Sequence, residues 1–355
     1  MDFKKESSLV LLGAGASKPA GLPLTTEISQ HMANPPQNTI LEPEDIGVIR
    51  FVIGALQMRK GVRNKDPFGD VNIERVFSAI QKLADRGRLR ISPFVNSWHN
   101  SVSDIEPVER TDQSHESNYA NAAVRMQREL TELLWCSEEK NDVSYLNPLV
   151  EFMSDKGGTV ATLNYDNSIE LAACNIGVDI DDGFDEWVRS GGRTDSFRNA
   201  SLLKPHGSLN WVHNLSLDDY QYRPPISEPT KIQMHPGQSA GERRALIFGT
   251  ENKLQADGPF LDIFQELKRR LENKSCLIVI GYSFNDGHIN YIIDSWLESH
   301  DNGKIIVIGA PYSKLEDHRL KSDADDKFFE NGSVVVDQVR FAGIGASRGI
   351  STLFG

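Results

Sequence analysis

Residues 8–17 read Ser-Leu-Val-Leu-Leu-Gly-Ala-Gly-Ala-Ser, an apolar run that ends in a glycine-rich turn. An uninterrupted run of branched apolar residues bounded by glycine is typical of a strand that is buried on both faces, as in a parallel sheet covered by helices. If one face met water, apolar and polar residues would alternate. The stretch therefore predicts a first strand over residues 8–12 of an α/β fold.

The same pattern recurs in four later segments, residues 159–163, 276–280, 304–308 and 333–336. The segments between these runs are long enough for helical crossovers, and apolar stripes at helical spacing lie in them. We predict four helices that pack these stripes into the core: Ile46, Ile49, Ile53 and Leu56; Ile73, Val76, Phe77, Ile80 and Leu83; Tyr119, Ala123, Met126, Leu130, Leu133 and Leu134; and Phe260, Phe264, Leu267 and Leu271.

The order of these elements predicts the fold class. Strands that alternate with helices indicate an α/β fold, with a Rossmann-like parallel sheet flanked by helices. Residues 31–150 contain three helical stripes and no convincing strand, so we expect a helical insertion there, after the first strand–helix unit. The Rossmann-like core then occupies residues 5–30 and 155–340. A loop-rich segment at 181–260 includes a short strand at 208–212.

Composition excludes several classes of protein. The 355 residues carry 38 Lys and Arg against 50 Asp and Glu, which gives a net charge of −12. Direct nucleic-acid binding is not expected, because it needs cations that neutralise phosphates. Cys136, Cys174 and Cys276 form no CxxC pair, so we predict neither a zinc site nor disulfides, and a cytoplasmic location. No apolar run reaches the roughly 18–20 residues that span a bilayer, so no membrane partner is expected.

The first candidate site is Gly13-Ala14-Gly15-Ala16-Ser17, directly after the first strand. Glycines there let the backbone turn tightly and approach a pyrophosphate, whose charge would meet free N–H groups and a helix N-terminus. The alternative is an ordinary strand-to-helix turn. A dehydrogenase fingerprint has Gly or Ala where Lys18 stands, and an acidic residue where residues 31–36 read HMANPP. Ordinary hydride transfer is therefore not predicted, and no Gly-Lys-Ser/Thr phosphate loop is present.

The second candidate is Thr162-Leu163-Asn164-Tyr165-Asp166, at the end of the strand that begins at Thr159. Ligands of open parallel sheets bind outside the carboxyl ends of strands, where Asn164 and Asp166 can both reach a ribose. Either residue can instead cap the following helix, predicted over residues 168–174. The sequence leaves both interpretations open.

The third candidate is Lys204-Pro205-His206-Gly207-Ser208. Histidine changes charge near neutral pH, and the glycine after it leaves room for a ligand, which favours general acid–base chemistry. A lone histidine in a turn is, however, more often structural than catalytic. The other eight histidines have no comparable context.

The fourth candidate, Gly281-Tyr282-Ser283-Phe284-Asn285-Asp286, again follows a buried strand. Gly281 permits close approach of a ligand, and Ser283 and Asn285 can hydrogen-bond a ribose or an adenine edge. The alternative is another strand-to-helix turn with Asp286 as the helix cap. Four polar turns at strand ends are more than turn chemistry alone explains.

Taken in order, these four turns resemble the sirtuin superfamily, and more closely its bacterial SIR2-like branch, which occurs in anti-phage defence systems. Leu22-Pro23, the continuation of the third turn through Trp211 and the whole fourth turn are also similar to that branch. The resemblance extends from about residue 8 to residue 310, within a single SIR2-like domain over residues 1–355.

The resemblance implies NAD+ as the substrate, held by Gly13 to Ser17, Leu22, Pro23 and Thr162 on one side and by Gly281, Tyr282, Ser283, Asn285 and Asp286 on the other. The first turn would embrace the pyrophosphate, and Gly281 with Ser283 would hold the adenosine ribose. Asn164 and Asp166 would lie against the nicotinamide ribose, and His206 would be the catalytic histidine.

The activity implied is that of an NAD+ glycohydrolase that releases nicotinamide and ADP-ribose. The family's protein deacylases carry four zinc-binding cysteines that this chain lacks, which argues against deacylation. Our hypothesis is that Asn164 orients water or the ribose, His206 is the general base, and Asp166 stabilises the developing cation. The alternatives are a non-catalytic NAD+ or ADP-ribose binding module that regulates an ATPase, and a deacylase without zinc.

The resemblance also implies control of the activity, because unrestrained NAD+ cleavage kills the host. We expect a gated, NAD+-depleting effector of anti-phage defence that acts as a homo-oligomer with a protein partner in trans. SIR2-like proteins of this size resemble those that work beside a HerA-type hexameric ATPase, and others pair with a short Argonaute.

Overall fold

The computed structural model of the protein describes residues 7–63, 66, 71–84, 114–193, 195–213, 229–231, 243–246, 259–300, 303–309 and 345–355. Its strands are β1 (Ser8–Leu12), β2 (Thr159–Thr162), β3 (Leu202–Leu203), β4 (Gly207–His213), β5 (Pro229–Lys231), β6 (Arg243–Leu246), β7 (Cys276–Ile280) and β8 (Lys304–Ile308). Its helices are α1 (Thr25–Ala33), α2 (Pro43–Val62), α3 (Ile73–Ala84), α6 (Ser114–Leu134), α7 (Asn147–Lys156), α8 (Ser168–Asn175), α9 (Phe184–Arg189), α10 (Phe260–Leu271), α11 (Gly287–Ser299) and α15 (Ala346–Phe354).

The parallel sheet confirms the predicted fold class. Five strands lie in the order β3-β2-β1-β7-β8, and every described pairing between them is parallel. β1, β7 and β8 have the predicted bounds, whereas β2 ends one residue early, at Thr162. The N–H of Leu163 still donates to the carbonyl of Leu12, so the chain leaves the sheet gradually. The strand predicted at 333–336 lies outside the described residues.

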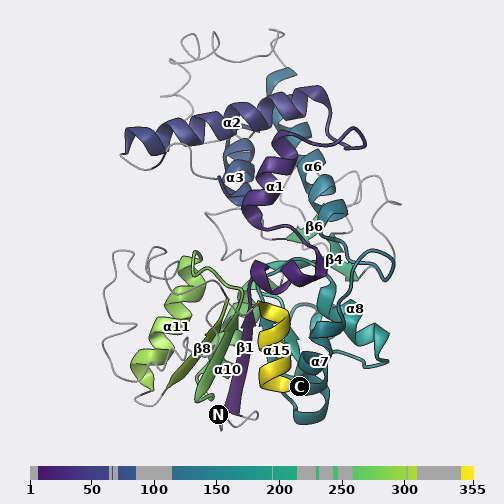
Figure 1. The fold of residues 1–355 in the computed structure, drawn as a ribbon, viewed down its shortest axis with the longest axis vertical. Coiled ribbons are helices and arrows are strands. Elements are labelled where there is room, and N and C mark those ends of the chain that lie inside the picture. Colours follow the sequence, from purple (N-terminus) through teal and green to yellow (C-terminus); the bar gives the residue numbers. More distant parts are fainter. Residues whose placement is uncertain are drawn as a thin grey trace. The chain divides into compact units, whose positions relative to one another are not determined.

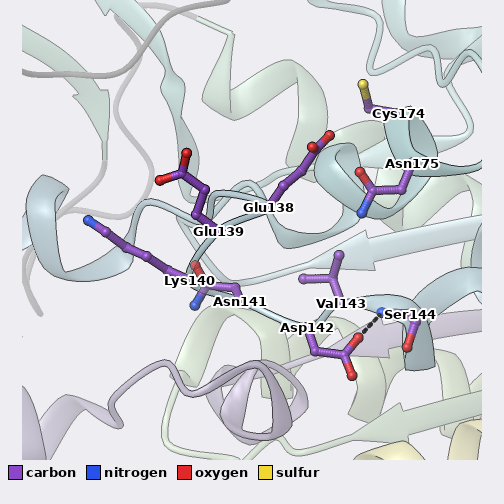
Figure 2. A pocket seen from close by; sticks show the side chains of 9 residues that line it. All are labelled: Glu138, Glu139, Lys140, Asn141, Asp142, Val143, Ser144, Cys174 and Asn175. Atoms are coloured by element: carbon purple, nitrogen blue, oxygen red, sulfur yellow. Dashed lines mark hydrogen bonds between the residues drawn. The ribbon is translucent and has the colours of Figure 1, made fainter.

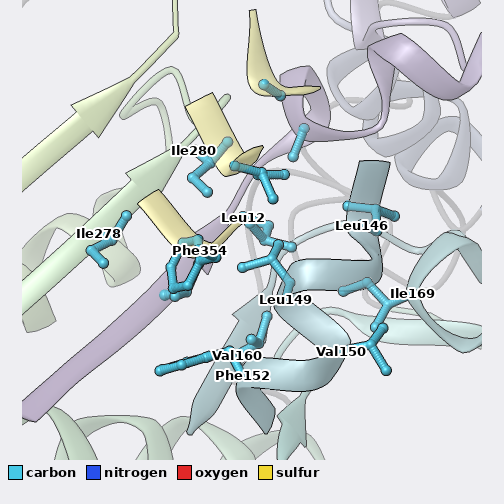
Figure 3. Close-up of a cluster of buried hydrophobic side chains, with 14 of the residues drawn as sticks. Leu12, Leu146, Leu149, Val150, Phe152, Val160, Ile169, Ile278, Ile280 and Phe354 are labelled. Carbon is cyan, nitrogen blue, oxygen red and sulfur yellow. The ribbon is translucent and has the colours of Figure 1, made fainter. Parts of the chain in front are cut away.

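Two layers of helices cover the two faces of this sheet (Figure 1). Leu9 and Leu11 of β1 pack with α9, α10 and α11, while Val10 and Leu12 pack with α7, α8 and α15. Because successive side chains of a strand point to opposite faces, a strand buried on both sides must be apolar throughout. Figure 3 shows the second cluster, where Leu12, Ile278 and Ile280 of the strands contact helix residues such as Leu149 and Phe354.

The chain divides into two compact units. The sheet unit comprises Met1–Leu22, Leu134–Ile247 and Lys253–Gly355, and the helical unit comprises Pro23–Leu133 and Phe248–Asn252. In the sheet unit, β4 lies between β5 and β6 in a second, antiparallel sheet. Among its described residues the helical unit contains α1, α2, α3 and α6 and no strand, and partly buried pairs such as His31–Glu129 (2.8 Å) and Arg125–Asp45 join its helices. No helix in the described ranges has the length and apolarity needed to cross a bilayer.

Candidate functional site

Four turns leave the carboxyl ends of neighbouring parallel strands in the sheet unit. Turn 1 (Gly13–Ser17) follows β1, turn 2 (Asn164–Asp166) follows β2, turn 3 (Lys204–Ser208) follows β3, and turn 4 (Gly281–Asp286) follows β7. Leu12 pairs in register with both Thr162 and Ile280, so the ends of these strands are level. The strand order reverses between β1 and β7, which is the switch point where open α/β sheets bind ligands.

Turns 1 and 4 are packed against each other through glycine backbone. The N–H of Gly13 donates to the carbonyl of Ile280 and the N–H of Gly15 to the carbonyl of Gly281, both at 2.9 Å. Gly281 has a φ of +64°, and a Cβ placed there would lie 2.2 Å from the backbone nitrogen of Ala16. Only glycine permits this approach, so the two turns form one continuous backbone platform.

The environment of turn 1 differs from the one predicted for it. Its N–H groups are engaged: besides those of Gly13 and Gly15, the N–H groups of Ala16 and Ser17 donate to the carbonyls of Gly13 and Ala14. One 3₁₀ turn (Ala14–Ala16) lies within turn 1 and a second (Lys18–Ala20) follows it, and the next α-helix, α1, begins only at Thr25 in the helical unit. The N–H groups of Gly13, Gly15, Ala16 and Ser17, which were expected to be free, are therefore used by Ile280 and Gly281 and by the local 3₁₀ turn. The assignment of Gly13, Ala14, Gly15, Ala16 and Ser17 to a pyrophosphate stays a prediction.

A buried hydrogen-bond chain joins turns 1 and 2. Asn164 Nδ2 donates to the carbonyl of Gly13 (3.0 Å) and to Ser17 Oγ (2.9 Å), and Ser17 Oγ donates to Asp166 Oδ2 (2.8 Å). These three polar residues are each less than one-tenth exposed. The structure thus brings together three residues from two motifs that lie far apart in the sequence.

The capping alternative for Asp166 also holds in part. Its second carboxylate oxygen, Oδ1, accepts the N–H (3.1 Å) and the hydroxyl (2.5 Å) of Ser168, the first residue of α8. One oxygen therefore fixes the start of the helix while the other faces turn 1. Thr162 supports the same turn, because its Oγ1 accepts the N–H of Asn164 at 3.2 Å.

His206 of turn 3 connects turns 2 and 4. Its Nδ1 lies 3.2 Å from the carbonyl oxygen of Leu163, the residue before Asn164, and its Nε2 lies 2.9 Å from Asp286 Oδ2. The imidazole is buried, with its ring centroid 6.4 Å from that of Tyr165 and 6.1 Å from that of Phe264. Nε2 is at ion-pair distance from Asp286, but among the described residues no acceptor or donor is aligned with it for a hydrogen bond. A buried, unaligned ring nitrogen is a group that a ligand can satisfy.

Asp286 has two structural partners at once. Its Oδ1 accepts the N–H groups of His288 (2.9 Å) and Ile289 (3.4 Å), so it is the N-cap of α11, as the alternative interpretation had it. Its Oδ2 faces His206. The sequence signal gave the cap but not the second contact.

Among the other residues of turn 4, Tyr282 is hydrogen-bonded to its neighbours, whereas Ser283 and Asn285 are exposed. Tyr282 Oη accepts the N–H of Asp286 (3.1 Å) and donates to Asn290 Oδ1 (2.9 Å), which ties the turn to α11. Ser283 and Asn285 are exposed, and Asn285 Nδ2 donates to Ser283 Oγ at 3.0 Å. Phe284 between them is buried and has a φ of +55°. The two side chains predicted to bind a nucleotide thus face solvent.

Leu22 and Pro23 lie at the boundary of the two units. Leu22 is buried in the sheet unit, and its N–H approaches the carbonyl of Ser17 at 3.4 Å. Pro23 is the first residue of the helical unit, so its part in a nucleotide site stays a prediction.

Sequence reasoning assigned no role to two residues that contact the turns. Tyr145 Oη donates to the carbonyl of Ala16 (2.7 Å), and burial, followed by the nearby Asp166 carboxylate, raises the pKa of this phenol. Lys204, fully buried, binds turn 2 and is treated below. No sequence signal marks Tyr145, whereas Lys204 stands two residues before His206.

The pocket in Figure 2 lies elsewhere in the sheet unit. It has a volume of about 720 Å³ and is lined by Glu138, Glu139, Lys140, Asn141, Asp142, Val143, Ser144, Cys174 and Asn175. The lining side chains are mostly polar and none belongs to the four turns. The N–H and hydroxyl of Ser144 lower the pKa of the Asp142 carboxyl, whereas burial raises the pKa of the Cys136 thiol beside the pocket segment. The chemistry of the four turns is therefore separate from this pocket.

The range that carries turns 2, 3 and 4 is also similar to a known family. Residues 158–331 match the family model of the SIR2-like domain. The SIR2-like range begins just before β2 and leaves turn 1 outside. No match among curated proteins was found.

Similar solved structures include "Crystal structure of Sir2 in complex with the inhibitor EX-527, 2'-O-acetyl-ADP-ribose and deacetylated p53-peptide" and "Sir2-p53 peptide-NAD+". Each is 11% identical over 98% of this chain and 91% of that chain, with a TM-score of 0.40. "Structure of Sir2Tm bound to a propionylated peptide" has the same identity and coverage with a TM-score of 0.41. At this distance the SIR2-like assignment depends on the family model.

Proposed function

We propose that the protein is an NAD+ glycohydrolase that cleaves the bond between nicotinamide and ribose. The observation that carries the proposal is the convergence of buried Asn164, Asp166 and His206 at the switch point of a parallel sheet, within or beside a SIR2-like range. The unaligned Nε2 of His206 supports it further, because a substrate hydroxyl or water can complete that nitrogen's hydrogen bonding.

The reaction breaks the glycosidic C–N bond, and the bonding electrons leave with nicotinamide, which departs as a neutral amide. Water adds to C1' of the ribose and loses a proton, so the products are nicotinamide, ADP-ribose and H+. The site must stabilise a cationic sugar and orient water. We assign the first task to the Asp166 carboxylate and the second to Asn164, whose amide is held by turn 1.

His206 is the proposed general base toward water or a ribose hydroxyl. For this, the water or ribose hydroxyl that gives up its proton must approach Nε2 of His206. Asp286 Oδ2 lies 2.9 Å from the same nitrogen. The Asp286 carboxylate lies beside the nitrogen that takes the proton, so its negative charge stabilises the imidazolium that forms. Asp286 is therefore more directly tied to His206 than to the nucleotide contact predicted for it.

The same proposal includes a biological role. We propose a gated, NAD+-depleting effector of anti-phage defence in the cytoplasm that works as a homo-oligomer. Its control would come from a HerA-type ATPase partner or, as a second candidate, a short Argonaute. This role is supported by the resemblance of the four turns to the bacterial SIR2-like branch.

The direct test is release of nicotinamide from NAD+ by the purified protein, alone and with its candidate partners. We expect equal amounts of nicotinamide and ADP-ribose, and a rate lowered about 100-fold or more in Asn164→Ala, as for the misplacement of a reacting group by about 1 Å. A melting curve of the variant shows whether it is folded. Binding of ADP-ribose without nicotinamide release would support the non-catalytic module instead. Release that requires an acetyl-lysine peptide would support a deacylase.

Asp286→Asn separates an effect on His206 from an effect on the nucleotide. Asparagine still caps α11, so the melting temperature is expected to stay close to that of the unchanged protein. The loss of the negative charge 2.9 Å from Nε2 of His206 is expected to lower kcat about 10- to 100-fold, about 1.4–2.7 kcal/mol in activation free energy, with KM for NAD+ nearly constant. A raised KM with an unchanged kcat would instead identify Asp286 as a nucleotide-binding residue.

A further inference from the structure

Lys204 is a cation in the interior of the sheet unit. Its side chain is 0% exposed, and its Nζ has three partners: the carbonyl oxygen of Asp166 (2.8 Å), Ser208 Oγ (2.8 Å) and Glu170 Oε1 (2.7 Å). An ammonium group has three donors, and here each has an acceptor. Burying a charge is costly unless it is paired and hydrogen-bonded, and Glu170 supplies the compensating carboxylate.

One of the three contacts, that with Ser208, spans His206 along the chain. Lys204 and Ser208 stand two residues before and two residues after the imidazole, and the ammonium joins them across turn 3. The N–H of Gly207 also donates to the carbonyl of Lys204 at 2.9 Å, which closes the backbone of the turn. The backbone on both sides of His206 is thereby fixed.

The same ammonium reaches the second turn. Asp166, whose carbonyl it binds, stands two residues after Asn164, and Leu209 donates its N–H to the carbonyl of Tyr165 at 2.9 Å. Two hydrogen bonds therefore join turns 2 and 3: one from the Lys204 ammonium to Asp166, and one from the backbone N–H of Leu209 to Tyr165. A displacement of either turn breaks at least one of these bonds.

We infer that Lys204 is a positioning residue that fixes His206 relative to Asn164 and Asp166. This inference rests on the proposed NAD+ hydrolysis at the same site. Misplacement of a reacting group by about 1 Å is enough to lower a rate about 100-fold, so loss of Lys204 is expected to lower turnover by about that factor in protein that is still folded.

Arg270 offers a matched control in the same unit. It is also a buried cation: its guanidinium donates to Thr159 Oγ1 (2.9 Å) and to the carbonyls of Ala200 (2.6 Å) and Phe197 (2.7 Å), and it pairs with Glu266. Thr159 is the first residue of β2, whereas turn 2 follows the last. Arg270 thus anchors the end of the strand that is remote from the four turns.

The test compares Lys204→Met with Arg270→Met in the full chain by melting curves and by nicotinamide release. We expect both variants to melt at lower temperature, but only Lys204→Met to lose kcat, by about 100-fold, with a smaller change in KM for NAD+. Should Lys204→Met not fold, Ser208→Ala removes one contact of the ammonium and is expected to lower kcat in the same direction. An unchanged kcat in folded Lys204→Met would overturn the inference. If Lys204→Met does not fold, an unchanged kcat in Ser208→Ala would overturn it.

Hydrogen exchange tests the inference without reference to catalysis. In Lys204→Met, or in Ser208→Ala where needed, the amides of Gly207 and Leu209 are expected to exchange faster than in Arg270→Met. Equal exchange at these amides would show that Lys204 does not fix turn 3. The unsubstituted protein could also release no nicotinamide, alone or with its partners, while the variants still differ in exchange. That result would contradict the proposed function and leave the positioning by Lys204 in place.

Discussion

Replacement of Gly281 by alanine is expected to lower the free energy of unfolding by about 2–5 kcal/mol. The residue has a φ of +64°, where an L side chain costs about 1–2 kcal/mol. The added Cβ would also lie 2.2 Å from the nitrogen of Ala16 and 2.4 Å from the carbonyl carbon of Gly15, and overpacking adds about 1–3 kcal/mol. Urea denaturation followed by circular dichroism measures the change.

Gly157→Ala is the control for this prediction. Gly157 ends α7 with a φ of +58°, but a Cβ there meets nothing within 4 Å. Only the conformational cost of about 1–2 kcal/mol is then expected. Equal losses in the two variants would show that turns 1 and 4 are not packed against each other as described. Because the steric conflict lies between those two turns, nicotinamide release is expected to fall in Gly281→Ala and not in Gly157→Ala.

Replacement of His206 by alanine is expected to lower the rate of nicotinamide release at least about 100-fold. Loss of a positioned general base typically removes a factor of about 100 to 10,000, and the remaining groups do not replace it. The substitution also leaves the buried Asp286 carboxylate without the imidazole at 2.9 Å, although its bonds to the start of α11 persist. The protein is therefore expected to stay folded while it loses turnover.

His300→Ala is the matched control. His300 follows α11 at the end opposite to Asp286, and its ring nitrogens lie near the carbonyls of Trp296 and Glu272, away from the four turns. Its loss is expected to change stability slightly and nicotinamide release not at all. A folded His206→Ala protein with normal nicotinamide release would contradict the assignment of His206 as general base and remove the main support for the four-turn site.

Much of the fold follows from local patterns. Continuous apolar runs predicted β1, β7 and β8 with their observed bounds, and the stripe at Phe260 to Leu271 predicted α10. β3 was missed because two residues carry no periodicity, and its place in the sheet is set by pairing with β2. The helix expected after turn 1 is present as α1 but begins only at Thr25, and the carbonyls of Ile280 and Gly281, far away in the chain, accept the N–H groups of Gly13 and Gly15 that were expected to be free.

The site shows the same division between local and distant interactions. The sequence placed polar, glycine-containing turns at strand ends, and it offered Asp286 as a helix cap. It did not show that Ser17 would join Asn164 to Asp166, that Asp286 would also face His206, or that the Lys204 ammonium would bind Ser208 on the other side of the histidine. Each of these contacts depends on which side chains come together when strands pair.

By itself, therefore, the sequence determined four of the five strands of the parallel sheet, β1, β2, β7 and β8, and the turns that carry polar chemistry, because hydrophobic periodicity and turn residues act over a few positions. Only the tertiary structure decided which atoms of those turns meet. The partners of Ser17 in turn 2 are 147 and 149 residues away along the chain, and their contact depends on the register of β1 against β2. Such contacts form when the strands pair into the sheet, and no local sequence pattern encodes them.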